Sequence, residues 1–193
     1  MINTLIEALS ALLVLTPLFL ILNRVRFHSG KRTLLYFLFA SYLAAVYHLT
    51  GLPTVLFLTF DVNLNLVPTA LFTKELVLSL LNVAMFVPLG FFLPLLWKKF
   101  RRLKNTLLFG VGATVFIELA QLFTYRATDI NDVITNTAGA LLGYLLFRLA
   151  HKLHPVGIAP AKERGDLLLI LAVTAAGMFF VQPLIAMFLY GIT

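Results

Sequence analysis

The sequence has no cysteine and few charged residues. Charged side chains make up 12% of its 193 residues, whereas a soluble domain is about one quarter charged. The lack of cysteine excludes disulfide frameworks, thiol nucleophiles and cysteine metal sites. What is abundant is apolar sequence, since 61% of the residues are hydrophobic and the mean hydropathy is +0.97. The composition therefore predicts an integral membrane protein.

Six apolar runs approach the length of about 20 residues that a membrane-spanning helix needs. They cover residues 4–22, 33–52, 76–97, 105–123, 133–150 and 167–190. The last run contains Gln182-Pro183 but no charge, and a kink accommodates a proline within a span. We therefore expect an all-α polytopic membrane helix bundle of about six transmembrane helices, forming a single membrane domain over residues 1–193.

The cations gather in alternate connections between these runs. All Lys and Arg residues except Lys74 and Arg126 lie in the connections after the first, third and fifth runs or, for Arg148, at the end of the fifth run. Under the positive-inside rule these basic connections face the cytoplasm, so both termini are expected outside. The formal net charge of +7 is then a consequence of topology, and nothing in the sequence predicts nucleic-acid binding.

The connection 53–74 is apolar but too interrupted to span, so it is expected to be interfacial or re-entrant. Gly51 and Pro53 are expected to end the preceding helix, and Val67-Pro68 to form a bend. Glycines in the fourth and fifth runs fit close helix packing. These glycines are Gly110, Gly112, Gly139 and Gly143, of which the last two are spaced as GxxxG.

Three of the polar residues inside the predicted spans stand out, namely Asn82, Glu118 and Asn136. A charge at the centre of a membrane helix costs about 2.5 to 3.5 kcal/mol on insertion scales, so such positions are informative. Counted along the helices, the three lie roughly 6 to 11 Å below the outer surface. They are expected to meet in a polar chamber open to the outside, walled by the third, fourth and fifth spans.

Further polar residues lie around these three positions. Gln121 shares a helix face with Glu118, and the outer connection 124–132 carries Arg126, Asp129 and Asp132.

The sequence leaves open a purely structural role for each of these polar groups. Asp129 and Asp132 suit an N-cap followed by an acidic residue in the first turn, Asn82 and Asn136 suit interhelical hydrogen bonds, and Glu118 and Arg126 suit a buried ion pair.

Four stretches together resemble the VanZ-like membrane protein family. They are NLNLVP (63–68), NVAMFVPLGFFLPLL (82–96), IELAQLF (117–123) and RATDINDVITNTAGALLGY (126–144). The resemblance covers about 33–150 and leaves the final span, 167–190, as an extra C-terminal element. The matching positions are Asn65, Pro68, Asn82, Phe86, Pro88, Gly90, Glu118, Gln121, Arg126, Asp129, Asp132, Asn136 and Gly139.

The resemblance implies a multi-pass protein of the bacterial cytoplasmic membrane, related to an accessory determinant of teicoplanin resistance. That family is not tied to a settled reaction. The first hypothesis is therefore an outward-facing polar site that binds or modulates an envelope lipid or lipid-linked precursor and affects teicoplanin susceptibility. The predicted ligand-binding residues are Asn65, Asn82, Glu118, Gln121, Arg126, Asp129, Asp132 and Asn136.

The second hypothesis is an intramembrane hydrolase or transferase that acts on such a lipid, with Glu118 or Asp132 as the acid or base. The sequence leaves open whether the protein is an enzyme. A transporter is disfavoured because the polar residues cluster on one side of the membrane. No cofactor is expected, and no metal site is expected because the histidines lie apart from clustered carboxylates.

Overall fold

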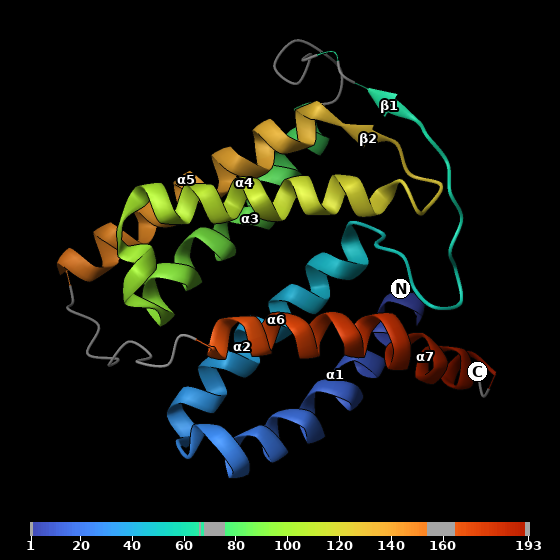
Figure 1. Cartoon of the computed structure of the whole chain (residues 1–193), viewed down its shortest axis with the longest axis horizontal. Coiled ribbons are helices and arrows are strands. Elements are labelled where there is room, and N and C mark those ends of the chain that lie inside the picture. The colour runs from blue at the N-terminus through green and yellow to red at the C-terminus, as the bar shows by residue number, and fades with distance from the viewer. Residues whose placement is uncertain (1, 66, 68–75, 154–164, 192–193) are drawn as a thin grey trace. The chain divides into compact units, whose positions relative to one another are not determined.

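The fold is almost entirely helical in a computed structural model, which describes residues 2–65, 67, 76–153 and 165–191 (Figure 1). The chain divides into two compact units. Unit 1 comprises Met1–Leu58 and Arg164–Thr193, and unit 2 comprises Thr59–Glu163. The expected all-α membrane bundle is confirmed, while the single membrane domain over 1–193 stays a prediction.

Each of the six expected spans forms a helix. The first five are α1 Ile2–Leu22, α2 Gly30–Leu49, α3 Leu76–Leu96, α4 Leu103–Gln121 and α5 Ile130–Leu153. The sixth comprises α6 Asp166–Ala176, the π-helical turn η3 Gly177–Val181 and α7 Gln182–Tyr190. Within the described residues, five helical stretches are long and apolar enough to cross a membrane, and α2 is not among them. A crossing by α2 and the outer position of the termini stay predictions.

In unit 1, α1 and α2 form a hairpin, and the long helix from α6 to α7 packs against both (Figure 1). The hairpin turns through the π-helical segment η1 Asn23–Phe27 and through His28, whose φ of 47° is left-handed. The Asn23 side chain stabilises the turn, because its Oδ1 accepts hydrogen bonds from the Ser29 N–H at 3.1 Å and the Thr33 hydroxyl at 2.7 Å.

A buried carboxylate holds this end of unit 1. Asp166 is 1% exposed and accepts hydrogen bonds from Arg26 Nε and the Tyr36 hydroxyl, each at 3.0 Å. Burying an ion is costly unless it is paired and hydrogen-bonded, and Asp166 has both kinds of partner. Arg26 and Asp166 belong to the first and fifth connections, which the charge pattern placed on the same side of the membrane.

The proline in the sixth span has a direct structural consequence. Pro183 has no N–H, so the carbonyl of Phe179, four residues earlier, lacks its usual partner within the helix. The N–H of Val55 donates to that carbonyl at 3.0 Å. The segment that follows α2 is therefore attached to the kinked helix within unit 1.

The C-terminus of α2 shows why Gly51 is needed. Its φ of 62° lies in the left-handed region that glycine adopts without a Cβ penalty. Gly51 N donates to His48 O and Leu52 N to Tyr47 O, each at 3.1 Å, which is the Schellman pattern that satisfies the last helix carbonyls. The predicted end of this helix is confirmed.

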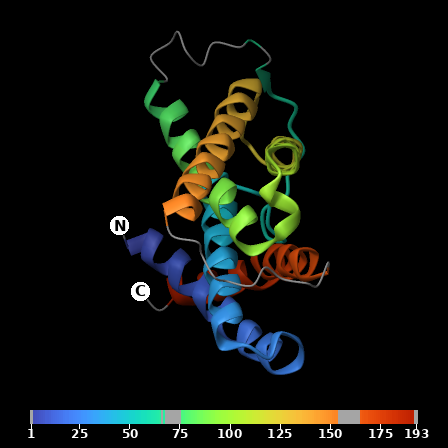
Figure 2. The ribbon, with the colours of Figure 1, turned by 90° about the vertical axis from the view of Figure 1, so that its left-hand side faces the viewer.

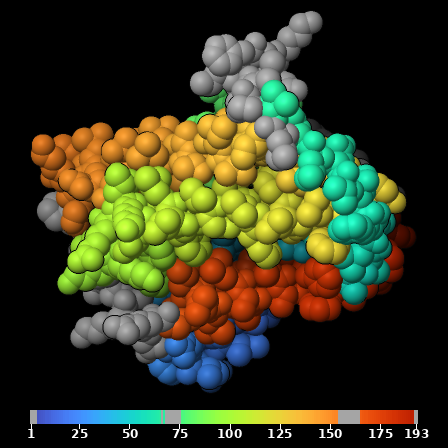
Figure 3. Space-filling model, turned by 45° about the horizontal axis from the view of Figure 1, so that its top comes forward, coloured from blue at the N-terminus to red at the C-terminus, as the bar shows by residue number. Residues whose placement is uncertain are grey.

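Unit 2 is built on a close crossing of α3 and α5 (Figure 2), with α4 alongside α5 (Figure 3). A Cβ added to Gly139 would lie 2.2 Å from Val83 O, and one added to Gly143 would lie 1.9 Å from Val87 O. On the other helix, a Cβ on Gly90 would lie 2.0 Å from Ala140 O. The GxxxG pair therefore lets the two backbones touch, as predicted.

The two glycines of α4 differ from this pair. A Cβ on Gly110 would meet the Ala140 Cβ at 3.0 Å, whereas a Cβ on Gly112 would meet nothing within 4 Å. The prediction that Gly112 serves close packing is wrong, because Gly112 is exposed. Spacing alone did not show which face of α4 is buried.

The described part of the connection 53–74 is not helical, because it makes a tight turn bridged by Thr54 and Phe57 and later forms a short strand. Within unit 2, Thr59 N donates to Phe123 O and Asp61 N to Leu122 O, at 3.2 and 3.0 Å, which ties the connection to the C-terminus of α4. The strand β1 Leu64–Asn65 then pairs in parallel with β2 Thr128–Asp129 (Figure 1). Pro68 and most of 66–74 lie outside the described residues, and the interfacial or re-entrant placement stays a prediction.

The glycine contact gives a direct stability test. We expect Gly143→Ala to destabilise unit 2 by about 1 to 3 kcal/mol, the usual cost of overpacking, because the new methyl group would meet the Val87 carbonyl of the facing backbone. Thermal unfolding of the purified protein, followed through Trp97 fluorescence, measures the change. Gly112→Ala is the matched control, and equal melting temperatures for both variants would contradict the packing account.

Candidate functional site

Polar side chains gather at one end of unit 2, where α5 begins and β1 pairs with β2. Four elements supply them, namely α3, α4, α5 and the β1–β2 pair. We call this group the polar cluster. Its members are Asn65, Asn82, Glu118, Asp129, Asn131 and Asp132.

Asp129 caps the N-terminus of α5. It directly precedes Ile130, the first residue of the helix, and its Oδ1 accepts hydrogen bonds from the backbone N–H and the side-chain amide of Asn131, both at 2.8 Å. This is the position and partner of an N-cap residue, which satisfies one of the free N–H groups at a helix start. The capping interpretation is confirmed for Asp129.

Glu118 completes this cap from another helix. In a capping box, a residue of the first helical turn accepts a bond from the backbone N–H of the cap residue. Here Glu118 Oε2 of α4 accepts the Asp129 N–H at 2.7 Å, and the Glu118 carbonyl accepts the Thr128 hydroxyl at 2.9 Å. Glu118 is 4% exposed. One buried carboxylate thus joins the end of α4 to the start of α5.

Asparagine side chains connect the cap to the extended segment. Asn65 Nδ2 donates to Asp129 Oδ2 at 2.9 Å, beside the β-bridge register that places Asn65 opposite Asp129. Asn131 Nδ2 also donates to the Val67 carbonyl at 3.1 Å. The two amides therefore fix residues 65 and 67 against the first turn of α5.

Asp132 and Asn82 form the contact between α5 and α3 at this end. Asn82 Nδ2 donates to Asp132 Oδ1 at 2.7 Å, and both side chains are half-buried. Asp129, Asp132 and Glu118 are close enough for the charges of the two aspartates to act on Glu118. The half-buried position of Asp132 makes it more accessible to a bound molecule than Glu118.

Asn136 lies deeper in the bundle, one turn beyond Asp132. It is 2% exposed, and its Nδ2 donates to the Thr114 hydroxyl of α4 at 3.0 Å. The interhelical hydrogen bond that the sequence allowed is therefore confirmed for Asn136, as it is for Asn82. The Asn136 Oδ1 atom is buried and has no hydrogen-bond partner within the described part of the chain.

The remaining predicted residues are placed differently. Gln121 is buried in the last turn of α4, three residues after Glu118. Arg126 is exposed in the connection to β2, and its charge acts on Glu118 through space. The ion pair between Glu118 and Arg126 that the sequence left open stays a prediction.

Sequence reasoning missed three residues of this region. Asn131 donates to the Asp129 side chain, Thr128 donates to the Glu118 carbonyl, and Thr114 accepts from Asn136. Thr114 stands four residues before Glu118, on the same helix face, so its spacing was a usable signal. The contact between Asn131 and the Val67 carbonyl had no such signal, because the two residues are distant in sequence.

The VanZ/LLP1 family model matches residues 34–151. The chain belongs to the VanZ/LLP1 family. Protein VanZ of Enterococcus faecium is 38% identical over 71 residues, which is 37% of this chain and 44% of that protein. The chain thus spans less than half the length of this VanZ relative, and no solved structure matches.

The VanZ/LLP1 match extends from α2 to α5. It includes every residue of the polar cluster, whereas α1, α6 and α7 lie outside it. Membership in this family, together with the apolar helices, makes the chain a multi-pass bacterial membrane protein. The family match over 34–151 covers nearly the same residues as the motif region predicted over about 33–150.

Two variants of Glu118 separate its acceptor geometry from its charge. Glu118→Leu leaves the Asp129 N–H without a partner, which costs about 1 to 3 kcal/mol for a buried group, so its melting temperature should fall. Glu118→Gln keeps an oxygen at the same place and should stay near wild type. Thermal unfolding of the three proteins tests this, and a glutamine variant as unstable as the leucine variant would show that the charge is required.

Proposed function

We propose that the polar cluster binds a lipid or lipid-linked component of the cell envelope, and that this binding lowers teicoplanin susceptibility. The observation that carries the proposal is the meeting of three carboxylates at one end of a membrane helix bundle. Ionisable residues in membrane segments are costly, and they are functional-site candidates for that reason. The name of the enterococcal relative and the family match support the link to teicoplanin.

Within the cluster, we assign contact with the ligand to the Asp132–Asn82 pair. Glu118 accepts the N–H of the cap residue Asp129, and Asp129 accepts an N–H of the first turn of α5, so we assign both carboxylates a mainly structural role. Asp132 and Asn82 are half-buried side chains on neighbouring helices. Together they offer a carboxylate and an amide to the hydroxyl, amide or amine groups of an envelope component.

An intramembrane hydrolase or transferase that acts on the same kind of lipid is the second candidate. It is favoured by the half-buried position of Asp132, which a substrate proton could reach, and by the exposed cation of Arg126 near the cluster. In this reading Glu118 or Asp132 serves as the acid or base, and Arg126 holds a phosphate or carboxylate of the substrate.

Antibiotic susceptibility tests the binding proposal. In a sensitive Gram-positive host, the wild-type chain should raise the inhibitory concentration of teicoplanin above that of empty vector. Asp132→Asn should lose the gain, because removing a charge-assisted hydrogen bond of about 1.5 to 3 kcal/mol lowers affinity about tenfold or more. Asp61→Asn is the matched control, since Asp61 is an exposed carboxylate of the same unit.

A blot of the membrane fraction measures the amount of each variant, so that differences in expression are not mistaken for differences in activity. The proposal fails if Asp132→Asn protects as well as Asp61→Asn at equal membrane levels. Native mass spectrometry provides the direct readout, because the wild type should retain an envelope lipid that Asp132→Asn loses.

Lipid analysis separates the enzyme from the binding protein. A binding protein leaves the same lipid profile in a deletion strain, in the complemented strain and in the Asp132→Asn strain. A hydrolase or transferase leaves an altered lipid in the deletion and Asp132→Asn strains. Finding such a lipid would replace the binding proposal with the enzymatic one.

A further inference from the structure

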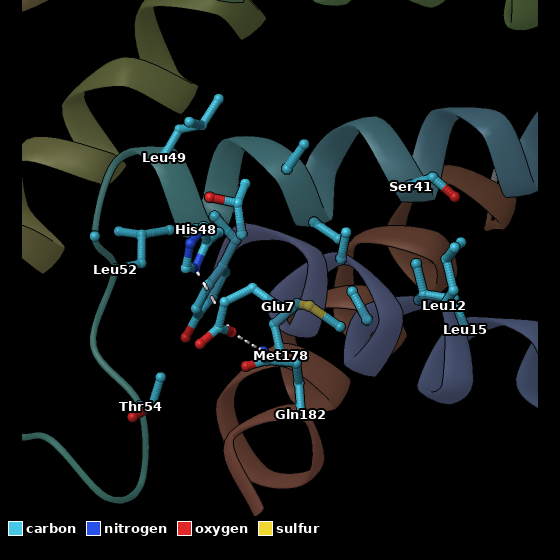
Figure 4. Close-up of a pocket in the computed structure, with 17 residues that line it drawn as sticks. Glu7, Leu12, Leu15, Ser41, His48, Leu49, Leu52, Thr54, Met178 and Gln182 are labelled. Carbon is cyan, nitrogen blue, oxygen red and sulfur yellow. Dashed lines mark hydrogen bonds and ion pairs between the residues drawn. The ribbon is translucent and has the colours of Figure 1, made fainter. Parts of the chain in front are cut away.

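Unit 1 contains a cavity of about 500 Å³ between α1, α2 and the helix from η3 to α7 (Figure 4). This volume falls within the range of about 300 to 1,000 Å³ that is typical of small-molecule sites. All of its lining residues belong to unit 1, and those from α1, η3 and α7 lie outside the family match. The cavity is therefore separate from the polar cluster.

Small side chains create the space. The lining includes Ala8 and Ala11 of α1 and Ala44 and Ala45 of α2. Leu12 and Leu15 extend the lining away from the polar residues, toward Ser41 (Figure 4). Eight residues separate Glu7 from Leu15, so the cavity runs roughly 12 Å along α1.

The polar end of the cavity is organised around one carboxylate. Glu7 accepts hydrogen bonds from the Gln182 amide and, at 2.9 Å, from the Tyr190 hydroxyl. His48 Nδ1 lies 3.8 Å from Glu7 Oε2 (Figure 4). A carboxylate has about four lone-pair sites, so the Glu7 carboxylate can accept further hydrogen bonds beyond those from Gln182 and Tyr190.

Two hydroxyls in the lining also have unused capacity. Ser41 Oγ and Thr54 Oγ1 are buried and have no hydrogen-bond partner among the described residues. Thr54 lies near the Glu7 end and Ser41 lies near Leu12 and Leu15 (Figure 4). A buried hydroxyl without a partner costs free energy.

We propose that this cavity binds a single-chain amphiphile whose protonated amine head pairs with Glu7 and whose alkyl chain lies between α1 and α2. The long apolar lining favours an alkyl chain, and the Glu7 carboxylate favours a positively charged head group. A fatty acid fits this lining poorly, because its carboxylate would face that of Glu7.

Site-specific photolabelling tests the proposal on the whole chain in phosphatidylcholine nanodiscs. The probes are a long-chain alkylamine with a diazirine on its chain and a fatty acid diazirine of equal length. The amine should label peptides that contain the cavity lining, and excess unlabelled alkylamine should remove that labelling. Glu7→Gln should reduce it by about tenfold, the factor expected for one lost charge-assisted hydrogen bond.

Two further variants test the proposal even if Glu7→Gln does not fold. Ala11→Phe places a ring in the cavity and should abolish the labelling, whereas Ala172→Phe, at an exposed position of α6, should leave it unchanged. Circular dichroism melting verifies that both variants are folded.

Three results would overturn the proposal. The first is amine labelling of the lining that excess alkylamine does not reduce. The second is equal labelling by the fatty acid and the amine in the wild type. The third is full labelling of a folded Ala11→Phe variant.

Discussion

The backbone N–H of Asp129 has no partner within its own helix, and the Glu118 carboxylate supplies one. The rest of unit 2 depends on this bond, because it sets where α5 begins relative to α4. Once α5 begins there, Asp129 can cap it and Asn65 can reach the cap. A helix start in an apolar bundle must satisfy its free N–H groups from the protein itself, and here a neighbouring helix does so.

The same constraint explains where polar groups lie in unit 1. Asp166 accepts hydrogen bonds from Arg26 and Tyr36 at one end of the unit, and Glu7 accepts them from Gln182 and Tyr190. Between these ends, α1, α2 and the helix from α6 to α7 carry no charged residue. Charged groups are therefore kept at helix ends, where donors from other helices or connections meet them, and these ends are the places where ligands can bind.

The sequence predicted the helices well because span length and apolarity are local properties. It also predicted that Asn82, Glu118, Asp129 and Asp132 belong together, since the first two are costly in lipid and the other two lie in the adjoining outer connection. It did not predict that Glu118 bonds a backbone N–H, because this depends on how α4 and α5 meet. The sequence likewise did not predict the cavity beside Glu7, since the cavity depends on how α1, α2 and α7 pack together.

The distribution of Lys and Arg predicts that the polar cluster faces the outside of the cell. The chain has no cysteine, so single cysteines report cleanly on its topology. Asp61 is attached near the cluster end of unit 2, and Lys152 lies at the far end of α5, with both exposed. A membrane-impermeant maleimide should label Asp61→Cys in intact cells and Lys152→Cys only after permeabilisation. The reverse pattern would contradict the account.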